Sequence, residues 1–288
     1  MREFIPESWT DPNFLPAALT LVLAAAGIVA LVALFLRRHR YSGMPLPGVT
    51  AWHLDWMEIS ALFILVYSWE LLAGPISRKI LVVPENPPAG LLAWQAVLDG
   101  ALLQAGMIAV FLLFSISLPF LRRPAMSTVR LSWPRAIGLG TFYFLCFIPA
   151  RLALELSWMG LLKWLSGLGL PVSMDEQDIA GVLGSAPPAA FAALIVLAGV
   201  VAPIVEETVF RAGLYRFLKG RFSMWGAVFF SSVIFSGMHI NLLVFPTLLL
   251  FGISLCLVYE ATGSIKVPIA MHAVFNLNSI LLIALRGG

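Results

Sequence analysis

The sequence predicts an all-α, polytopic integral membrane protein with about eight transmembrane helices. Of its 288 residues, 60% are hydrophobic and only 11% are charged, and the mean hydropathy is +0.94. Soluble domains carry about 25% charged residues. Several apolar runs are long enough to cross a hydrocarbon core of about 30 Å at about 1.5 Å per helical residue. We see no second domain, internal repeat or low-complexity tract.

The predicted spans follow one another with short polar loops between them. The first, Phe14 to Leu36, follows an acidic segment, residues 1–13, that lacks the basic region of a signal peptide, so we expect the span to stay in the mature protein. The other spans are Trp56 to Ala73, a segment within Leu91 to Leu121, about Ala136 to Leu165, Ala189 to Leu218, Trp225 to Ile240, Leu242 to Tyr259 and Val267 to Leu285.

Charge in the loops predicts the orientation. The first span ends directly before Arg37-Arg38-His39-Arg40, and twelve Lys and Arg side chains fall on the predicted inner side against four on the outer side. Cytoplasmic loops carry the excess of Lys and Arg. We therefore expect both termini outside, with the protein integral to the membrane, most simply the cytoplasmic (inner) membrane of a bacterium. The basic residues form no run with interleaved aromatics, so we expect no nucleic-acid partner.

Proline and charge inside the first four spans give three structural expectations. The segment from Gly74 to Ala89 contains four prolines, and proline breaks a helix interior, so we expect a loop there and an end of the second span at Ala73. Glu58 and Glu70 lie near the ends of that span and are interpreted as interfacial. In the fourth span, Arg151 and Glu155 stand four residues apart and are expected to pair.

Two adjacent carboxylates and an arginine interrupt the fifth span, in the run Val205-Glu206-Glu207-Thr208-Val209-Phe210-Arg211. Ionised side chains at membrane depth cost several kcal/mol unless they are paired or lie in a watered cavity. On a helix Glu207 and Arg211 share a face, whereas Glu206 points about 100° away and has no partner in its own helix. The run is either an interhelical salt bridge with a spare acid or a carboxylate that does chemistry.

A histidine on the next span matches Glu206 in depth. Glu206 and His239 are equally far from the turn at Gly220 to Ser223. In an antiparallel helical hairpin, residues at equal distance from the turn lie at the same level, here about 24 Å from it. A lone membrane histidine is usually a hydrogen-bond partner between helices. A histidine level with an unpaired glutamate favours chemistry instead.

His272 and Asn276 stand four residues apart on the last span and project from one face. Both can donate hydrogen bonds, so together they could hold a developing oxyanion in a water-poor site. The alternative is helix packing, which we accept for Asn278. Cys146 and Cys256 lie within apolar segments and are interpreted as small hydrophobic side chains.

A carboxylate and an imidazole that share a water can activate it for attack on a peptide carbonyl. No Gly-x-Ser-x-Gly nucleophile elbow is present near Ser236 or elsewhere in the sequence. His239, His272 and Glu206 could instead hold a catalytic zinc, since two histidines and a carboxylate suffice. The usual His-Glu-x-x-His pattern is absent, so zinc is the minor alternative and we expect no cofactor.

Three short motifs now stand in order on separate helices: Glu206-Glu207-x-x-x-Arg211, Phe235-x-x-x-His239 and His272-x-x-x-Asn276. They resemble the signature motifs of the CPBP family, intramembrane glutamic endopeptidases similar to the type II CAAX prenyl protease and the bacteriocin-processing or immunity (Abi) proteins. The resemblance covers about Ala189 to Leu285, and all seven motif positions agree.

The resemblance implies an all-helical fold with a catalytic cavity open to the cytoplasmic side, and peptide hydrolysis without a metal. By this resemblance Glu206 and His239 activate water, while His272 and Asn276 stabilise the oxyanion. Glu207, Arg211 and Phe235 complete the motifs, and we interpret the Glu207 to Arg211 pair as fixing the helix and leaving Glu206 free.

We therefore expect one integrated membrane domain, in which residues 1–188 carry no recognised motif and residues 189–288 form the CPBP-like catalytic core. The predicted function is an intramembrane endopeptidase acting on a membrane-associated or lipid-modified peptide within the lipid bilayer. Two alternatives stay open: a non-catalytic immunity or membrane chaperone protein, and a proton-coupled transporter.

Overall fold

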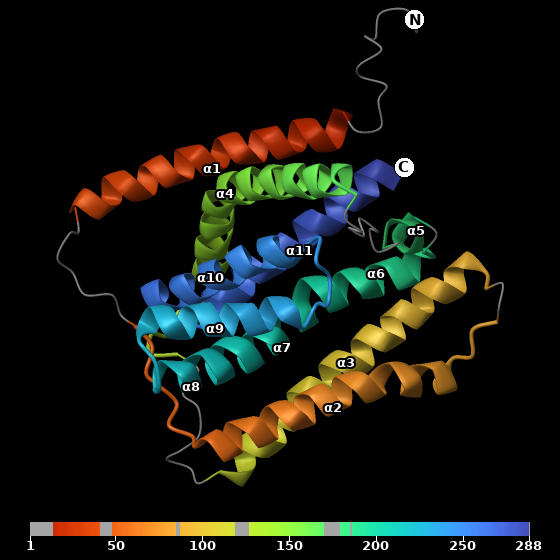
Figure 1. Cartoon of the computed structure of the whole chain (residues 1–288), viewed down its shortest axis with the longest axis horizontal. Coiled ribbons are helices and arrows are strands. Elements are labelled where there is room, and N and C mark those ends of the chain that lie inside the picture. The colour runs from red at the N-terminus through yellow and green to blue at the C-terminus, as the bar shows by residue number, and fades with distance from the viewer. Residues whose placement is uncertain are drawn as a thin grey trace, which may run out of the picture.

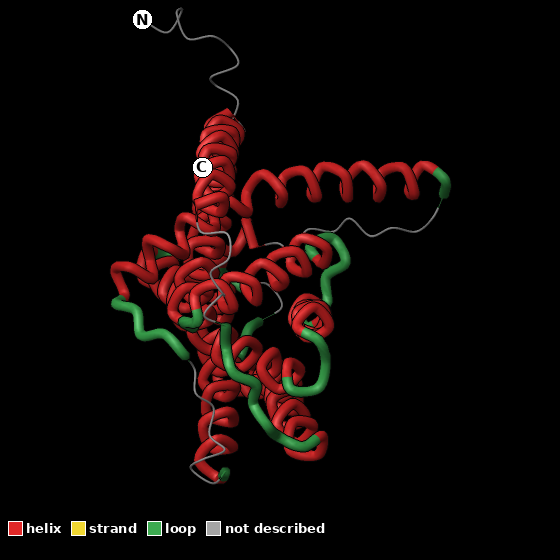
Figure 2. The backbone as a smooth tube through the Cα atoms, turned by 90° about the vertical axis from the view of Figure 1, so that its left-hand side faces the viewer, coloured by secondary structure: helices red, strands yellow, loops and turns green. Residues whose placement is uncertain are grey.

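The computed structural model describes residues 14–40, 48–84, 87–118, 127–169, 179–184 and 186–287, and within these ranges it contains helices and loops but no strand (Figures 1 and 2). The predicted all-α fold is confirmed. The elements are α1 Phe14–Arg40, α2 Trp56–Ile80, α3 Ala89–Ser117, α4 Trp133–Gly167, α5 Ile179–Gly184, α6 Pro188–Val196, η3 Leu197–Val201, α7 Ala202–Glu206, η4 Glu207–Tyr215, α8 Arg216–Lys219, α9 Met224–Gly237, α10 Phe245–Thr262 and α11 Lys266–Gly287.

Among the described residues, six helices are long and apolar enough to cross a membrane: Trp56–Ile80, Gly90–Ser117, Trp133–Gly167, Pro188–Lys219, Phe245–Thr262 and Lys266–Leu285. The remaining two predicted spans correspond to shorter apolar helices, Ala18–Leu31 within α1 and Met224–Gly237. The chain is thus a polytopic membrane protein with six candidate spans among the described residues, and the predicted total of eight stays a prediction. Its orientation stays a prediction, and the acidic segment 1–13 lies outside the described residues.

The predicted end of the second span is wrong, because α2 continues to Ile80 with Pro75 inside it. Proline lacks only the one N–H that would donate to the carbonyl of Leu71, four residues back, and transmembrane helices often tolerate this loss. The extension places Glu70 in the interior of the helix, and its interpretation as an interfacial residue stays a prediction. Glu58 does lie at the helix start, in a capping box with Asp55.

The helices pack as a hairpin beside a larger bundle. α2 and α3 run alongside each other and contact the continuous helix from α6 to α8 (Figure 1). α9 lies against η4, α8 and α10, while α11 packs against α4 and η3. α4 bends sharply within its length (Figure 1), which the proline at position 149 explains. The predicted pair of Arg151 and Glu155 is confirmed, with Nε to Oε1 at 2.7 Å.

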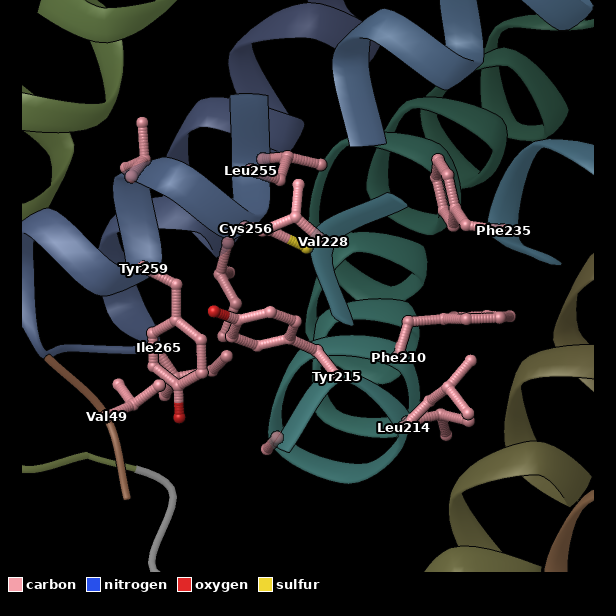
Figure 3. Close-up of a cluster of buried hydrophobic side chains, with 14 of the residues drawn as sticks. Val49, Phe210, Leu214, Tyr215, Val228, Phe235, Leu255, Cys256, Tyr259 and Ile265 are labelled. Carbon is pink, nitrogen blue, oxygen red and sulfur yellow. The ribbon is translucent and has the colours of Figure 1, made fainter. Parts of the chain in front are cut away.

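The buried core centres on η4, which contributes Phe210, Leu214 and Tyr215 to a cluster with Phe235 of α9 and with α10 (Figure 3). A hydrogen-bond network around Glu260 lies at one end of this cluster. Glu260 Oε1 accepts hydrogen bonds from the Tyr215 hydroxyl at 2.7 Å and from Lys219 Nζ at 2.6 Å. Lys219 Nζ also donates to the carbonyl of Val49, which ties the segment before α2 to the bundle.

The close approach of α4 to α11 depends on Gly140. A Cβ atom at this position would lie 2.7 Å from both the Cβ of Ala270 and the backbone nitrogen of Met271. Backbone atoms cannot give way as a flexible side chain can. The absence of a side chain at position 140 therefore sets the position of the α11 segment that carries His272.

We predict that Gly140→Ala lowers the thermal unfolding temperature of the purified protein in detergent, because overpacking of a tight contact costs about 1–3 kcal/mol. Gly138→Ala on the same helix is the matched control, since a Cβ there meets nothing within 4 Å. The control should be neutral or slightly stabilising. Equal melting temperatures for the two variants would contradict the role given to Gly140.

Candidate active site

The helix that carries Glu206 is irregular, and Pro203 explains part of the irregularity. In the π-helical turn η3, the N–H of Ala202 bonds to the carbonyl of Leu197, five residues back, instead of to Ala198. The next residue is Pro203, which has no N–H. The carbonyl of Ala198 therefore has no donor within its own helix. The side-chain amide of Asn276 supplies one, with Nδ2 to O at 2.7 Å.

Glu207 is the most enclosed charge of the site and has two partners. Its side chain is fully buried, Oε2 lies 3.1 Å from Arg211 Nε, and Oε1 lies 2.9 Å from His272 Nδ1. The predicted pair of Glu207 and Arg211 is confirmed. The guanidinium of Arg211 lies over the ring of Phe235, 4.2 Å from its centroid. A cation over an aromatic face gains stabilisation where hydrogen-bond acceptors are lacking, which gives Phe235 a physical role.

Glu206 faces two other neighbours. Its Oε1 accepts a hydrogen bond from Gln104 Nε2 at 3.2 Å, and its Oε2 lies 3.9 Å from His272 Nε2. The side chain of Glu206 retains 17% exposure, whereas Glu207 has none. The two adjacent carboxylates thus differ as their helical spacing predicted: Glu207 is sealed in an ion pair, and Glu206 is the accessible acid.

The predicted hairpin around Gly220 to Ser223 is present, because α8 and η4 pack against α9. Phe210 and Phe235 are in edge-to-face contact at 5.3 Å between ring centroids, from opposite arms (Figure 3). Phe210 follows Glu206 by four residues and Phe235 precedes His239 by four, so this contact has the register that the spacing of Glu206 and His239 requires.

His239 itself lies just beyond the end of α9 and is exposed. Its ring packs against Phe235 at 5.2 Å, and its Nδ1 lies 3.0 Å from the Phe235 carbonyl. Among the described residues, no hydrogen bond or ion pair joins His239 to Glu206, so their shared water stays a prediction. The following residue, Ile240, has a φ of 46°, a left-handed conformation that is strained for a β-branched side chain.

The partners of the two imidazoles indicate which nitrogen carries the proton. A carbonyl oxygen and a carboxylate accept hydrogen bonds but donate none. The Nδ1 of His239 therefore donates to Phe235, and the Nδ1 of His272 donates to Glu207. In both residues Nε2 is left for chemistry. In His272 that nitrogen faces Glu206.

The structure brings most of the predicted site together. Glu206, Glu207, Arg211, His272 and Phe235 form one contiguous cluster, and His239 joins it through Phe235. Asn276 lies one turn beyond His272, but one of its amide hydrogens is committed to the carbonyl of Ala198. Its role as an oxyanion donor therefore depends on the second hydrogen and stays a prediction.

Sequence reasoning missed two polar residues of the amino-terminal spans. Gln104 of α3 is only 6% exposed and donates to Glu206. Glu70 of α2 is in electrostatic range of Glu206, and its Oε2 is buried without a hydrogen bond among the described residues. The available signal was a glutamine in the middle of an apolar span. It was missed because Gln104 belongs to no short sequence motif.

In the part of the chain that the structure describes, no three His, Cys, Asp or Glu side chains converge as metal ligands do. The proposed zinc ligands His239, His272 and Glu206 do not form such a group. The Nδ1 of His272 is bonded to Glu207, and the Nδ1 of His239 faces a backbone carbonyl.

Two comparisons with known proteins agree with the site. Residues 188–278 match the family model "Type II CAAX prenyl endopeptidase Rce1-like". The chain is also 30% identical over 104 residues to the "Putative membrane peptidase YdiL" of Bacillus subtilis (strain 168), which covers 36% of this chain and 41% of that protein. No solved structure is significantly similar to the chain. The matched segment contains all seven motif positions and confirms the resemblance to the CPBP family seen in the sequence.

Proposed function

We propose that the protein is an intramembrane endopeptidase that hydrolyses a peptide bond of a membrane-associated or lipid-modified peptide, using a water molecule activated by Glu206 and His239. The observation that carries this proposal is the contrast between the two carboxylates. Glu207 is neutralised by Arg211 and bonded to His272, whereas the side chain of Glu206 keeps 17% exposure and its Oε2 lies 3.9 Å from His272 Nε2. A structural ion pair has no need of this second, unpaired acid.

In the proposed reaction, Glu206 takes a proton from the water while the oxygen of the water bonds to the peptide carbonyl carbon. The Nε2 of His239 accepts a hydrogen bond from the second O–H group of the water and so orients the water molecule. The carbonyl oxygen becomes an oxyanion. When the C–N bond breaks, the proton held by Glu206 passes to the leaving amine nitrogen, so the carboxylate is regenerated.

His272 and Asn276 are proposed as the donors to the oxyanion. Because the Nδ1 of His272 already donates to Glu207, Nε2 can donate only when the ring carries both protons. The carboxylate of Glu207 balances that positive charge, as in other carboxylate and histidine pairs. Asn276 would contribute the amide hydrogen that is not bonded to Ala198. Donors fixed before the reaction stabilise the transition state without reorganisation.

The proposed substrate class rests on the comparisons and on the membrane fold. The matching family model is named for a CAAX prenyl endopeptidase and the relative for a membrane peptidase. The chain spans 41% of that relative's length, so its substrate and activity are carried over only as a proposal. Metal-independent catalysis and residence in a bacterial cytoplasmic membrane belong to the same proposal.

We predict that Glu206→Ala and His239→Ala each abolish cleavage and leave the melting temperature within a few degrees of wild type, because Glu206 lies outside the buried ion pair and His239 is exposed. Comparative proteomics of membrane and secreted fractions identifies the uncleaved species in cells carrying Glu206→Ala. The purified wild-type enzyme should then cleave that species in excess EDTA. Cleavage by purified Glu206→Ala at a near-normal rate would refute the proposal, and loss of cleavage in EDTA would favour zinc.

The ion pair predicts a different pattern for Arg211. Arg211→Met leaves the charge of Glu207 buried without its guanidinium, which destabilises a protein by about 3–5 kcal/mol. The double variant Glu207→Gln with Arg211→Met removes both charges and should recover part of the lost melting temperature. Additive losses in this double-mutant cycle would mean that the two side chains do not act as a pair.

Asn276→Ala should have two effects. Loss of an oxyanion donor costs about 2.7–4 kcal/mol of transition-state stabilisation in kcat, and loss of the bond to the Ala198 carbonyl lowers the melting temperature. Asn278→Ala, two residues along the same helix, is the matched control and should change neither. If Asn276→Ala lowered only the melting temperature, the residue would hold the helix and take no part in the reaction.

A further inference from the structure

We propose that Gln104 on α3 is a positioning residue of the active site, whose amide fixes the carboxylate of Glu206 so that one oxygen is held and the other faces the reacting water. The catalytic part of this inference rests on the function proposed above. It assigns a role to a span outside residues 188–278, the segment that matches the family model.

Burial of the Gln104 side chain costs free energy unless its amide makes a hydrogen bond. It lies midway along the 28-residue apolar helix Gly90–Ser117 and is only 6% exposed. A buried amide in an apolar environment loses its hydrogen bonds to water, at about 1–3 kcal/mol by mutational measurements. Among the described residues the only hydrogen bond of its side chain is the one to Glu206, 3.2 Å from Nε2 to Oε1, and its own Oε1 has no partner.

The geometry gives the two oxygens of Glu206 different tasks. Oε1 is held by Gln104, and Oε2 lies 3.9 Å from His272 Nε2, beyond direct hydrogen-bond length. A carboxylate held at one oxygen has lost its rotation about the terminal bond. The second oxygen is thereby directed at the place where the water has to lie. Holding a catalytic group in its productive geometry contributes to rate without any contact to substrate.

The charges around Glu206 explain why the holding group is a neutral amide. Arg211 belongs to the same motif as Glu206, but it is paired with Glu207 and lies over Phe235. Glu70 adds a second acidic group in electrostatic range of Glu206. A hydrogen bond to the charged form of a carboxylate favours that form. An amide gives this stabilisation without forming an ion pair, so the carboxylate of Glu206 is held in place but not neutralised by its holding group.

Three variants separate positioning from packing. Gln104→Glu keeps the shape of the side chain but replaces the donor with a second acid, and Gln104→Met keeps the volume without any donor. Gln95→Met, on the same helix, is the matched control because Gln95 donates to a different carboxylate, that of Asp99, at 3.0 Å. All three are compared with wild type in detergent, with the melting temperature measured for each.

On the species identified by the proteomic comparison, Gln104→Met should lower kcat about 10- to 100-fold with KM nearly unchanged, the loss expected for one hydrogen bond to a charged group. Gln104→Glu should lower kcat at least as much, although it is the closer match in shape. Gln95→Met should keep the wild-type kcat. If Gln104→Glu were as active as wild type, or if the variants raised KM alone, positioning by the amide would be refuted.

A readout without substrate separates this inference from the proposed function. Dicyclohexylcarbodiimide reacts with protonated carboxyl groups in apolar surroundings, and mass spectrometry measures its addition to Glu206. Loss of the amide donor frees Oε1 of Glu206 for reaction, so Gln104→Met should be labelled several times faster than wild type or Gln95→Met at the same pH. Equal labelling rates would overturn the inference. Faster labelling in a protein that cleaves nothing would support the contact and refute the peptidase.

Discussion

The buried charge of Glu207 is the constraint on which the rest of the site depends. A carboxylate with no exposure in a membrane helix has to be neutralised by neighbours that the fold holds in place. Arg211 comes from the same helix, His272 from α11, and Phe235 of α9 covers the guanidinium. Three helices are thereby fixed around one point. Glu206, one residue earlier, then lies at a defined position among them.

The same helix has to be irregular to place its polar groups. π-helical turns shift the backbone register and are frequent at functional sites, and here they precede and follow α7, which carries Glu206. The missing donor at Pro203 leaves the Ala198 carbonyl to Asn276, so α11 is attached to this helix by a side-chain amide as well as by His272. Both attachments come from residues of one motif, four positions apart.

Contacts within one helix or one hairpin could be predicted from spacing alone. The pairs of Glu207 with Arg211 and of Arg151 with Glu155 follow from the helical repeat, and the hairpin register follows from the position of its turn. Contacts between distant helices could not be predicted in this way. The partner of Gln104 is 102 residues away in sequence, and the choice of Ala198 as partner of Asn276 depends on a register shift that no residue pattern encodes. The helix through Pro75 was missed because the rule that proline ends a helix comes from water-soluble proteins and is relaxed in transmembrane helices.

The amino-terminal and carboxy-terminal spans contribute different kinds of residue to the candidate site. The carboxy-terminal spans carry every residue of the three motifs, and they are also the segment that matches the family model. The amino-terminal spans contribute polar groups beside the same cluster: Gln104 donates a hydrogen bond to Glu206, and the carboxyl group of Glu70 lies in electrostatic range of Glu206. A short motif contains only residues that lie a few positions apart on one helix. The electrostatic environment of Glu206 is completed by α2 and α3, so the amino-terminal spans are part of the site and not only its support in the membrane.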